Sequence, residues 1–108
     1  MAEAKDQFTL LDLRVSVTEI RGRSVCGLKV GDYFELRASS RVVIPEGKHF
    51  CLFALAAVLP LLPAKQRALD PNDWLASDSL VACPDPDEQL IMKIESIGRA
   101  RLRKSDLT

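Results

Sequence analysis

The sequence lacks several features that mark common protein classes. Fifteen Lys and Arg against fifteen Asp and Glu give a net charge of zero, so the chain lacks the broad basic surface that binds duplex nucleic acid. The most apolar run, residues 50–62, contains Pro60 and is shorter than the ~20 residues of a membrane-spanning helix. Residues 1–7 include acids, and no apolar leader follows them. We therefore expect a cytoplasmic protein that binds neither duplex nucleic acid nor a membrane.

Cysteine and histidine are scarce and widely spaced. The three cysteines, Cys26, Cys51 and Cys83, form no C-x-x-C pair, and an odd number cannot all join in disulfides within one chain. In a reducing compartment we expect free thiols. Together with His49, the single histidine, they have the composition of a Cys3His zinc site, but structural zinc ligands usually come in closely spaced pairs. We therefore expect no metal ion and no other cofactor.

The chain has the length of one domain. With 108 residues, of which 47% are hydrophobic, it can bury a core without disulfide or metal support. Residues 1–8 are polar and predict a flexible lead, residues 9–98 carry the domain, and residues 99–108 predict a basic tail. Such a tail suits an RNA or an acidic partner, and it is equally typical of a solvated terminus.

Alternation of apolar and polar residues predicts the strands. Leu11, Leu13, Val15 and Val17 alternate with polar neighbours, which is typical of a half-buried antiparallel strand. Other segments show the same alternation or many β-forming residues, and turn signals separate them. These further predicted strands are residues 30–37, 41–44, 80–83 and 89–97.

Two helices are predicted in the middle of the chain. Residues 50–59 are apolar on nearly all sides at helical spacing, which indicates a buried helix. Pro60 ends it, and residues 63–69 predict a short second helix. The fold class is therefore α+β, with a small antiparallel sheet of four or five strands packed on one buried helix. We expect the apolar face of the first strand and the first helix to share one core.

Three fragments occur in a distinctive order. Cys26 precedes the Lys-Val-Gly-Asp-Tyr-Phe segment of residues 29–34, and Cys51 opens the Ala- and Leu-rich helix. Cys83 lies in an Ala-Cys-Pro-Asp-Pro segment ahead of the last strand. This set resembles an uncharacterised family of short single-domain prokaryotic proteins, and the resemblance covers residues 11–97. It implies one α+β domain of bacterial origin with the three cysteines as family positions, and it implies no activity.

The sequence departs from the pattern of that family at two points. Gly27 and Leu52 stand where many relatives have proline after the cysteine. Many relatives also have a histidine between the first cysteine and the Gly-Asp turn, and here that stretch is Gly-Leu-Lys. If the family holds a Cys/His metal site, part of that site is missing from this chain.

Cys51 and His49 are the candidate catalytic residues. Cys51 lies at the start of the predicted helix, where backbone N–H groups favour a thiolate. His49 is the only side chain whose ordinary titration lies near neutral pH, which suits general acid–base chemistry. The alternatives are a core thiol and a solvated loop histidine.

Cys26, Cys83, Asp32 and Trp74 are the candidate ligand-binding residues. Strand ends and a helix start can meet at one rim of a small sheet, so we expect the three cysteines and His49 to border one concavity. Asp32 or Trp74 would lie at its edge. The alternatives are scattered thiols that fill core gaps, a turn-forming aspartate and a packing tryptophan. The carboxylates of Asp85, Asp87 and Glu88, together with Asp32, have the oxygen ligands of a hard-cation site, and a solvated turn is the alternative that we expect for residues 85–88.

These observations favour a small bacterial protein that binds a small molecule or a partner protein, as an accessory component or small enzyme of a metabolic pathway. A thiol- or metal-dependent enzyme that uses Cys51, Cys83 and His49 is the second hypothesis. A structural subunit of a larger complex is the third. The sequence does not decide whether the protein is an enzyme, and it leaves a homo-oligomer open.

Overall fold

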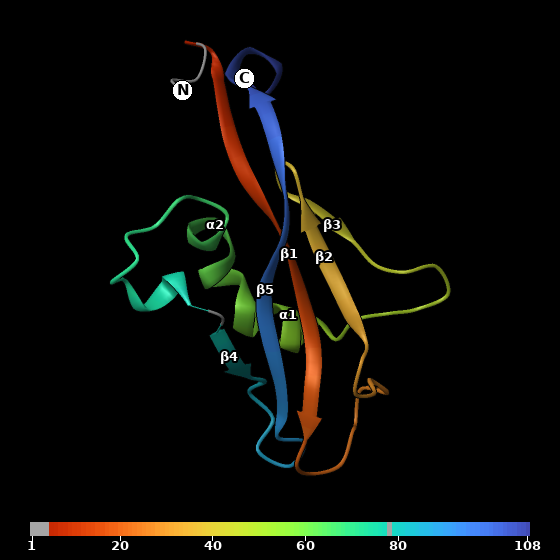
Figure 1. Ribbon diagram of the computed structural model, residues 1–108. Helices are drawn as coiled ribbons and strands as arrows, with labels where there is room; N and C mark the ends of the chain where they lie inside the picture. The colour runs from red at the N-terminus through yellow and green to blue at the C-terminus, as the bar shows by residue number, and fades with distance from the viewer. Residues whose placement is uncertain (1–4, 78) are drawn as a thin grey trace.

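A single antiparallel sheet of five strands is the framework of the protein. The computed structural model describes residues 5–77 and 79–108, and the strands follow the order β3-β2-β1-β5-β4 (Figure 1). Every neighbouring pair is antiparallel. The predicted α+β class is confirmed. The strands are β1 (Gln7–Ile20), β2 (Tyr33–Arg37), β3 (Arg41–Val43), β4 (Ser79–Ala82) and β5 (Leu90–Arg103).

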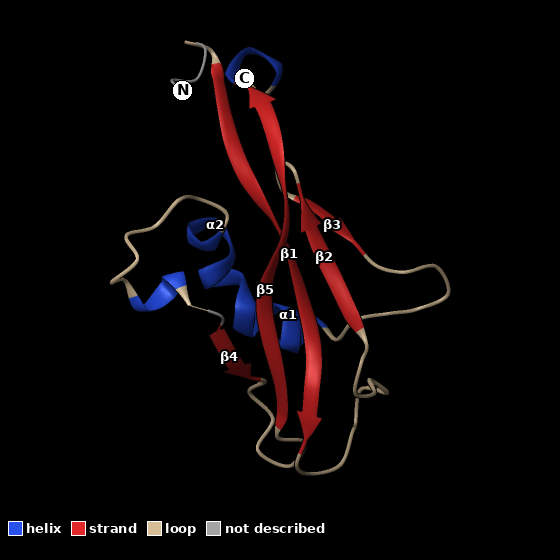
Figure 2. Ribbon diagram, in the orientation of Figure 1, coloured by secondary structure: helices blue, strands red, loops and turns tan. Residues whose placement is uncertain are grey.

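One continuous helical segment covers one face of this sheet (Figure 2). It consists of α1 (Leu52–Val58), the 3-10 turn η1 (Leu59–Leu61) and α2 (Leu62–Lys65). Pro60 lies in η1, where its missing N–H and fixed backbone angle interrupt the α-helical pattern. Two further 3-10 turns, η2 (Trp74–Ala76) and η3 (Lys104–Asp106), lie outside this layer.

The core lies between the sheet and the helical segment. Leu13, Val15 and Val17 of β1 are at most 1% exposed, and they belong to one buried cluster with Val58 and Leu62 of the helical layer. The prediction that the first strand and the helix share a core is therefore confirmed. β5 adds the other alternating set to the same cluster, Leu90, Met92 and Ile94.

The first helix is amphipathic, in contrast to the prediction of a helix buried on nearly all sides. Ala54 and Val58 are buried, whereas Leu52, Phe53 and Leu59 are more than half exposed. The reason is that the sheet covers only one side of the helix. The apolar residues of the opposite side remain at the surface, where they help to form a pocket wall.

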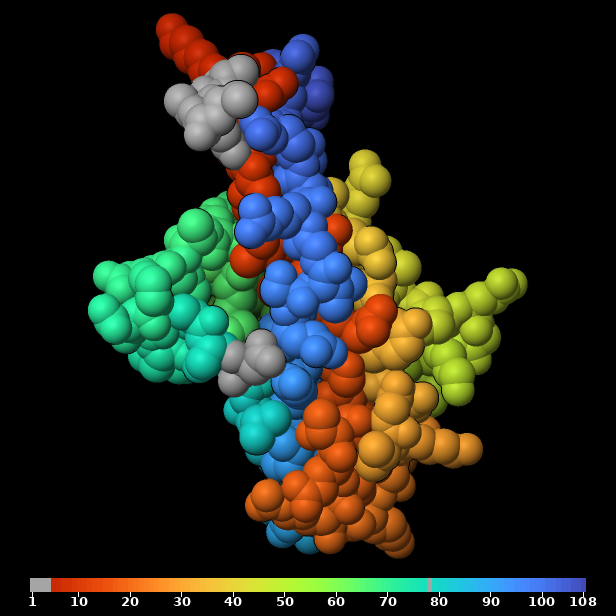
Figure 3. All heavy atoms as spheres, viewed as in Figure 1, coloured from red at the N-terminus to blue at the C-terminus, as the bar shows by residue number. Residues whose placement is uncertain are grey.

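The sheet extends beyond both predicted domain boundaries. β1 begins at Gln7, within the predicted flexible lead, and residues 1–4 of that lead lie outside the described residues. β5 continues to Arg103, through most of the predicted basic tail, because residues 99–103 pair with residues 7–11 of β1. These paired segments form a two-stranded ribbon that projects from the body of the molecule (Figure 3). None of the helices in the described part of the chain is long and apolar enough to cross a membrane.

Candidate functional site

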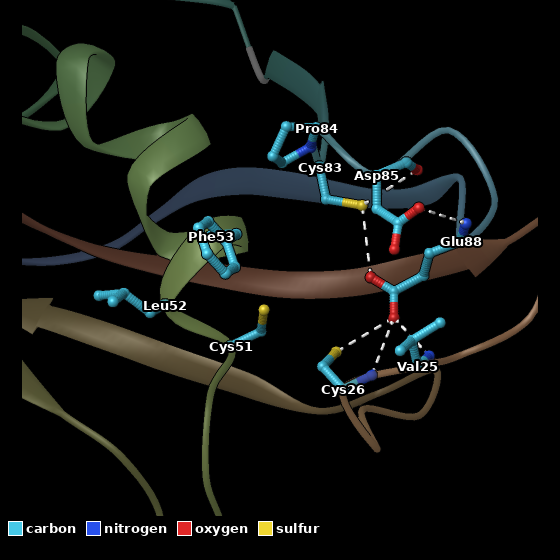
Figure 4. Close-up of a pocket in the computed structure, with 9 residues that line it drawn as sticks. All are labelled: Val25, Cys26, Cys51, Leu52, Phe53, Cys83, Pro84, Asp85 and Glu88. Atoms are coloured by element: carbon cyan, nitrogen blue, oxygen red, sulfur yellow. Dashed lines mark hydrogen bonds between the residues drawn. The ribbon is translucent and has the colours of Figure 1, made fainter.

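The three cysteines line one pocket, which lies between the helix start and two loops (Figure 4). The cavity has a volume of roughly 550 Å³. This arrangement brings together residues that are far apart in the sequence. The sequence analysis expected the three cysteines to border one concavity in this way. The lining residues are Val25, Cys26, Cys51, Leu52, Phe53, Cys83, Pro84, Asp85 and Glu88.

Two of the cysteines stand next to a secondary-structure element, and the third lies in a loop. Cys51 is the residue immediately before α1, and its side chain makes no capping hydrogen bond. Cys83 follows β4, and its backbone N–H still pairs with Leu90 O at 2.9 Å. Cys26 lies in the connection from β1 to β2, beside Gly27, whose φ of +82° favours glycine. All three are free thiols.

The loop that carries Cys26 is held against the turn between β4 and β5. The N–H groups of Gly22 and Arg23 donate to the carbonyl oxygens of Glu88 and Asp87, at 3.0 and 3.1 Å. A Cβ atom at Gly22 would lie 1.9 Å from Asp87 O, so only glycine permits this close approach. The two backbones therefore bring Cys26 and Glu88 to the same place.

Glu88 is the central polar residue of the pocket. Its side chain is nearly completely buried, with only 2% of the residue exposed. Oε2 accepts hydrogen bonds from Val25 N at 2.8 Å, Cys26 N at 3.2 Å and Cys26 Sγ at 3.2 Å. Oε1 accepts one from Cys83 Sγ at 3.4 Å. Glu88 thus links two thiols that belong to different loops, as the dashed lines in Figure 4 show.

The environment affects the titration of Glu88 and Cys26 in opposite directions. Burial by itself raises the pKa of Glu88, but the hydrogen bonds from Val25 and Cys26 outweigh it and hold that pKa below its usual value. Burial raises the pKa of the Cys26 thiol to about 11, and the bond to the Glu88 carboxylate adds to the shift. At neutral pH the pair is therefore a carboxylate and a neutral thiol. This is the wrong protonation state for a nucleophilic Cys26.

His49 is not among the residues that line the pocket. It is exposed, and its Nε2 lies 2.8 Å from the backbone oxygen of Cys26. The histidine therefore supports the Cys26 loop from outside, whereas the sequence placed it on the rim of the concavity. The imidazole ring reaches solvent and bonds to a backbone oxygen, so it has polar partners without lining the cavity.

The sequence also placed Asp32 or Trp74 at the edge of the pocket, and neither lines it. Asp32 forms its turn by accepting from Lys29 N at 3.0 Å, and Lys48 Nζ lies 3.7 Å from its other oxygen. Trp74 lies in η2, beyond the helical layer, and is 69% exposed. Asp32 therefore follows the alternative of a turn-forming residue, whereas Trp74 is too exposed to be the packing residue that the sequence offered as its alternative.

Glu88 is the residue whose position the sequence analysis missed. The segment around it reads as a solvated acidic turn, and Asp87 is indeed exposed. Glu88 differs because it lies two residues before Leu90, so it continues the buried side of the alternation in β5, whereas Gln89 between them is exposed. No sequence signal separates it from its acidic neighbours except that position.

The pocket wall combines apolar surface with negative charge. Leu52 and Phe53 of α1 and Val25 of the loop form the apolar part, and Asp85 and Glu88 carry the carboxylates. The lining residues include no Lys, Arg or His. Within residues 5–77 and 79–108, no group of three or more His, Cys, Asp or Glu side chains is already spaced to hold a metal ion.

Comparisons with known proteins add no identification. No protein-family model, no curated protein and no solved structure matches this chain.

Proposed function

We propose that this protein binds a small organic molecule in the pocket of the three cysteines. The observation that carries the proposal is the convergence of all three cysteines and one buried carboxylate, from separate parts of the chain, on a cavity of roughly 550 Å³. Such a volume lies within the range of ligand sites, which are mostly apolar with a few polar groups that fix orientation. The apolar wall of Val25, Leu52 and Phe53 supplies the larger part of that surface.

Binding is better supported than nucleophilic catalysis. An enzyme that uses Cys51, Cys83 and His49 needs the imidazole within reach of a thiol, and His49 faces a backbone oxygen outside the cavity. Cys26, one of the two thiols that donate to the Glu88 carboxylate, is held neutral. We therefore propose a binding or accessory role in a metabolic pathway, in the reducing cytoplasm of a bacterium, where the three thiols stay reduced.

A fragment titration tests the proposal. We expect a neutral aromatic probe, phenylpropanol, to cause saturable amide shifts at pocket residues in ¹H–¹⁵N spectra, centred on Cys26, Cys51 and Glu88. Cys51→Phe fills the cavity and should abolish these shifts. Val30→Phe is the matched control, because Val30 is 63% exposed and does not line the pocket.

The opposite pattern would reject the proposal. If the shifts spread over residues far from the pocket, or if they persist unchanged in Cys51→Phe, the cavity is not the binding site. A homo-oligomer that covers Leu52 and Phe53 would appear in the same samples as a doubled mass in light scattering.

A further inference from the structure

Buried charged groups in the described part of the protein all have polar partners, and those of Glu88 are neutral. The carboxylate of Glu35 pairs with Arg14 and Arg37, each at 2.7 Å. The ammonium of Lys65 donates to the carbonyl oxygens of Leu75 and Ser77, at 2.7 and 2.6 Å. Within the described residues, Glu88 has no cationic partner, and its hydrogen bonds come from neutral N–H and S–H groups.

An ionised carboxylate at this depth is costly unless something balances its charge. The backbone N–H groups of Val25 and Cys26 keep it ionised by occupying Oε2. Oε1 is different, because in the described structure it accepts only the thiol of Cys83, at the long distance of 3.4 Å. A carboxylate oxygen has two lone pairs, so Oε1 retains the capacity to accept a stronger donor.

The surroundings of the pocket strengthen the negative potential. Asp85 adds a second carboxylate to the lining, and none of the lining residues is Lys or Arg. Arg21 approaches from another direction. It lines a separate cavity with Cys83 and Asp85, and its guanidinium pairs with Glu19 at 3.2 Å.

We infer that the ligand of this pocket is an organic cation, with an ammonium group bound at Glu88 Oε1 and an apolar body against Val25, Leu52 and Phe53. This inference rests on the proposed binding function and adds the charge of the ligand. The ammonium supplies the charge that the protein omits beside Glu88, and a hydrogen bond between charged groups is roughly twice as strong as one between neutral groups.

Two features favour an organic cation over a bare metal ion. The cavity of roughly 550 Å³ is much larger than one ion needs, and more than half of the surface of Leu52 and Phe53 is free to contact an apolar body. A metal ion would use none of this surface.

A matched set of probes tests the charge. Phenylpropylamine, phenylpropanol and phenylpropanoate share an aromatic body and differ in having a positive, neutral or negative head. In calorimetric titrations at neutral pH, we expect the amine to bind roughly 10- to 100-fold more tightly than the alcohol. We expect the carboxylate to bind more weakly than both. Zn²⁺ alone is titrated in parallel as the metal probe.

Variants test whether a preference for the amine over the alcohol depends on Glu88. Glu88→Gln keeps one oxygen acceptor and removes the charge, so it should bring the amine and the alcohol to within about threefold of each other. Because this variant can perturb the fold, Asp85→Asn at the rim is measured as well and should reduce the amine preference by a smaller factor. Asp87→Asn is the control, since Asp87 is exposed and does not line the pocket.

The outcomes separate the two proposals. If the alcohol binds in the pocket as tightly as the amine, the binding function stands and the inference about charge is wrong. If none of the three aromatic probes binds, both are rejected. Stoichiometric binding of Zn²⁺ that is lost in Glu88→Gln, without any preference for the amine, would also overturn the inference, because the missing cation would then be a metal ion.

Discussion

The thiol of Cys26 donates a hydrogen bond to the carboxylate of Glu88 at 3.2 Å, across 62 positions of sequence. This contact joins the loop after β1 to the turn before β5. It also places an ionised group next to a thiol that stays protonated. The arrangement of the pocket, its charge and the stability of both loops therefore depend on one buried carboxylate.

Loss of that carboxylate should destabilise the protein. Glu88→Ala leaves the N–H groups of Val25 and Cys26 without their acceptor, together with two thiols. Each buried unsatisfied donor costs about 1–3 kcal/mol, so we expect a loss of about 2–4 kcal/mol in the free energy of unfolding. Urea denaturation measures it. Asp87→Ala, at an exposed neighbour, should change stability by less than ~0.5 kcal/mol, and an equal effect of both variants would contradict this role.

Cys26 should react slowly with alkylating reagents. Its pKa is raised to about 11 by burial, so at pH 8 its thiolate fraction is roughly 100-fold or more below that of an ordinary cysteine. Iodoacetamide labelling followed by peptide mass spectrometry gives the rate at each pH. In urea the rate should rise to that of an unfolded thiol. Labelling at pH 8 that is equally fast in folded and unfolded protein would disprove the shift.

The same raised pKa predicts a loss of stability at alkaline pH. The folded state holds the Cys26 proton up to about pH 11, whereas the unfolded thiol ionises near pH 8.5–9. Between these values the unfolded state binds fewer protons, so the free energy of unfolding falls as the pH rises. Cys26→Ser should flatten this part of the profile in urea titrations, and a wild-type slope that is unchanged in the variant would argue against Cys26 as the cause.

Acid should destabilise the protein through the buried carboxylate of Glu35. Burial by itself raises the pKa of Glu35, but the hydrogen bonds from Arg14 and Arg37 outweigh it and lower that pKa below its usual value. Stability from this group is present above the unfolded pKa of about 4.3 and is lost as the pH falls through the folded one. Glu35→Gln should therefore lose less stability than the wild type between pH 6 and pH 3. An identical drop in both proteins would exclude Glu35 as the main contributor.

The helical layer should show a clear difference between its two sides. Leu62 is 2% exposed and packs in the core, so Leu62→Ala should cost about 2–5 kcal/mol. Leu59 is 54% exposed, and Leu59→Ala should cost less than ~1 kcal/mol. Chemical denaturation of the two variants makes the comparison. Similar losses would show that the outer side of the helix is covered in solution, for example by a second copy.

Much of the fold was predictable because its signals are local. The alternation in β1 and β5 arises from a sheet with one buried face, and it identified Leu13, Val15 and Val17 as core residues. The outer side of α1 was not predictable in this way. Leu52 and Phe53 are as apolar as core residues, and only the one-sided cover of the sheet leaves them exposed.

The candidate site was predictable only in part. The three cysteines were expected at one rim because they stand at the ends of elements, and they do line one pocket. Glu88 was not expected there, since burial of one acid within an acidic turn depends on the backbone pairing of distant residues 21–23 with 87–89. His49 and Trp74 were misplaced because a residue type says nothing about which side of a loop it occupies.

The pairing of β1 with β5 has a consequence for how the protein is made. Gln7 lies opposite Arg103, so the central strand β1 pairs with a strand that follows it only after residues 21–89. During synthesis β1 has neither β5 nor the Glu88 turn until residues 88–103 have left the ribosome. Contacts between such distant residues slow folding, since the loop between them must first close. Until β5 has been made, the edge of β1 that pairs with it stays open, and an unpaired strand edge favours aggregation.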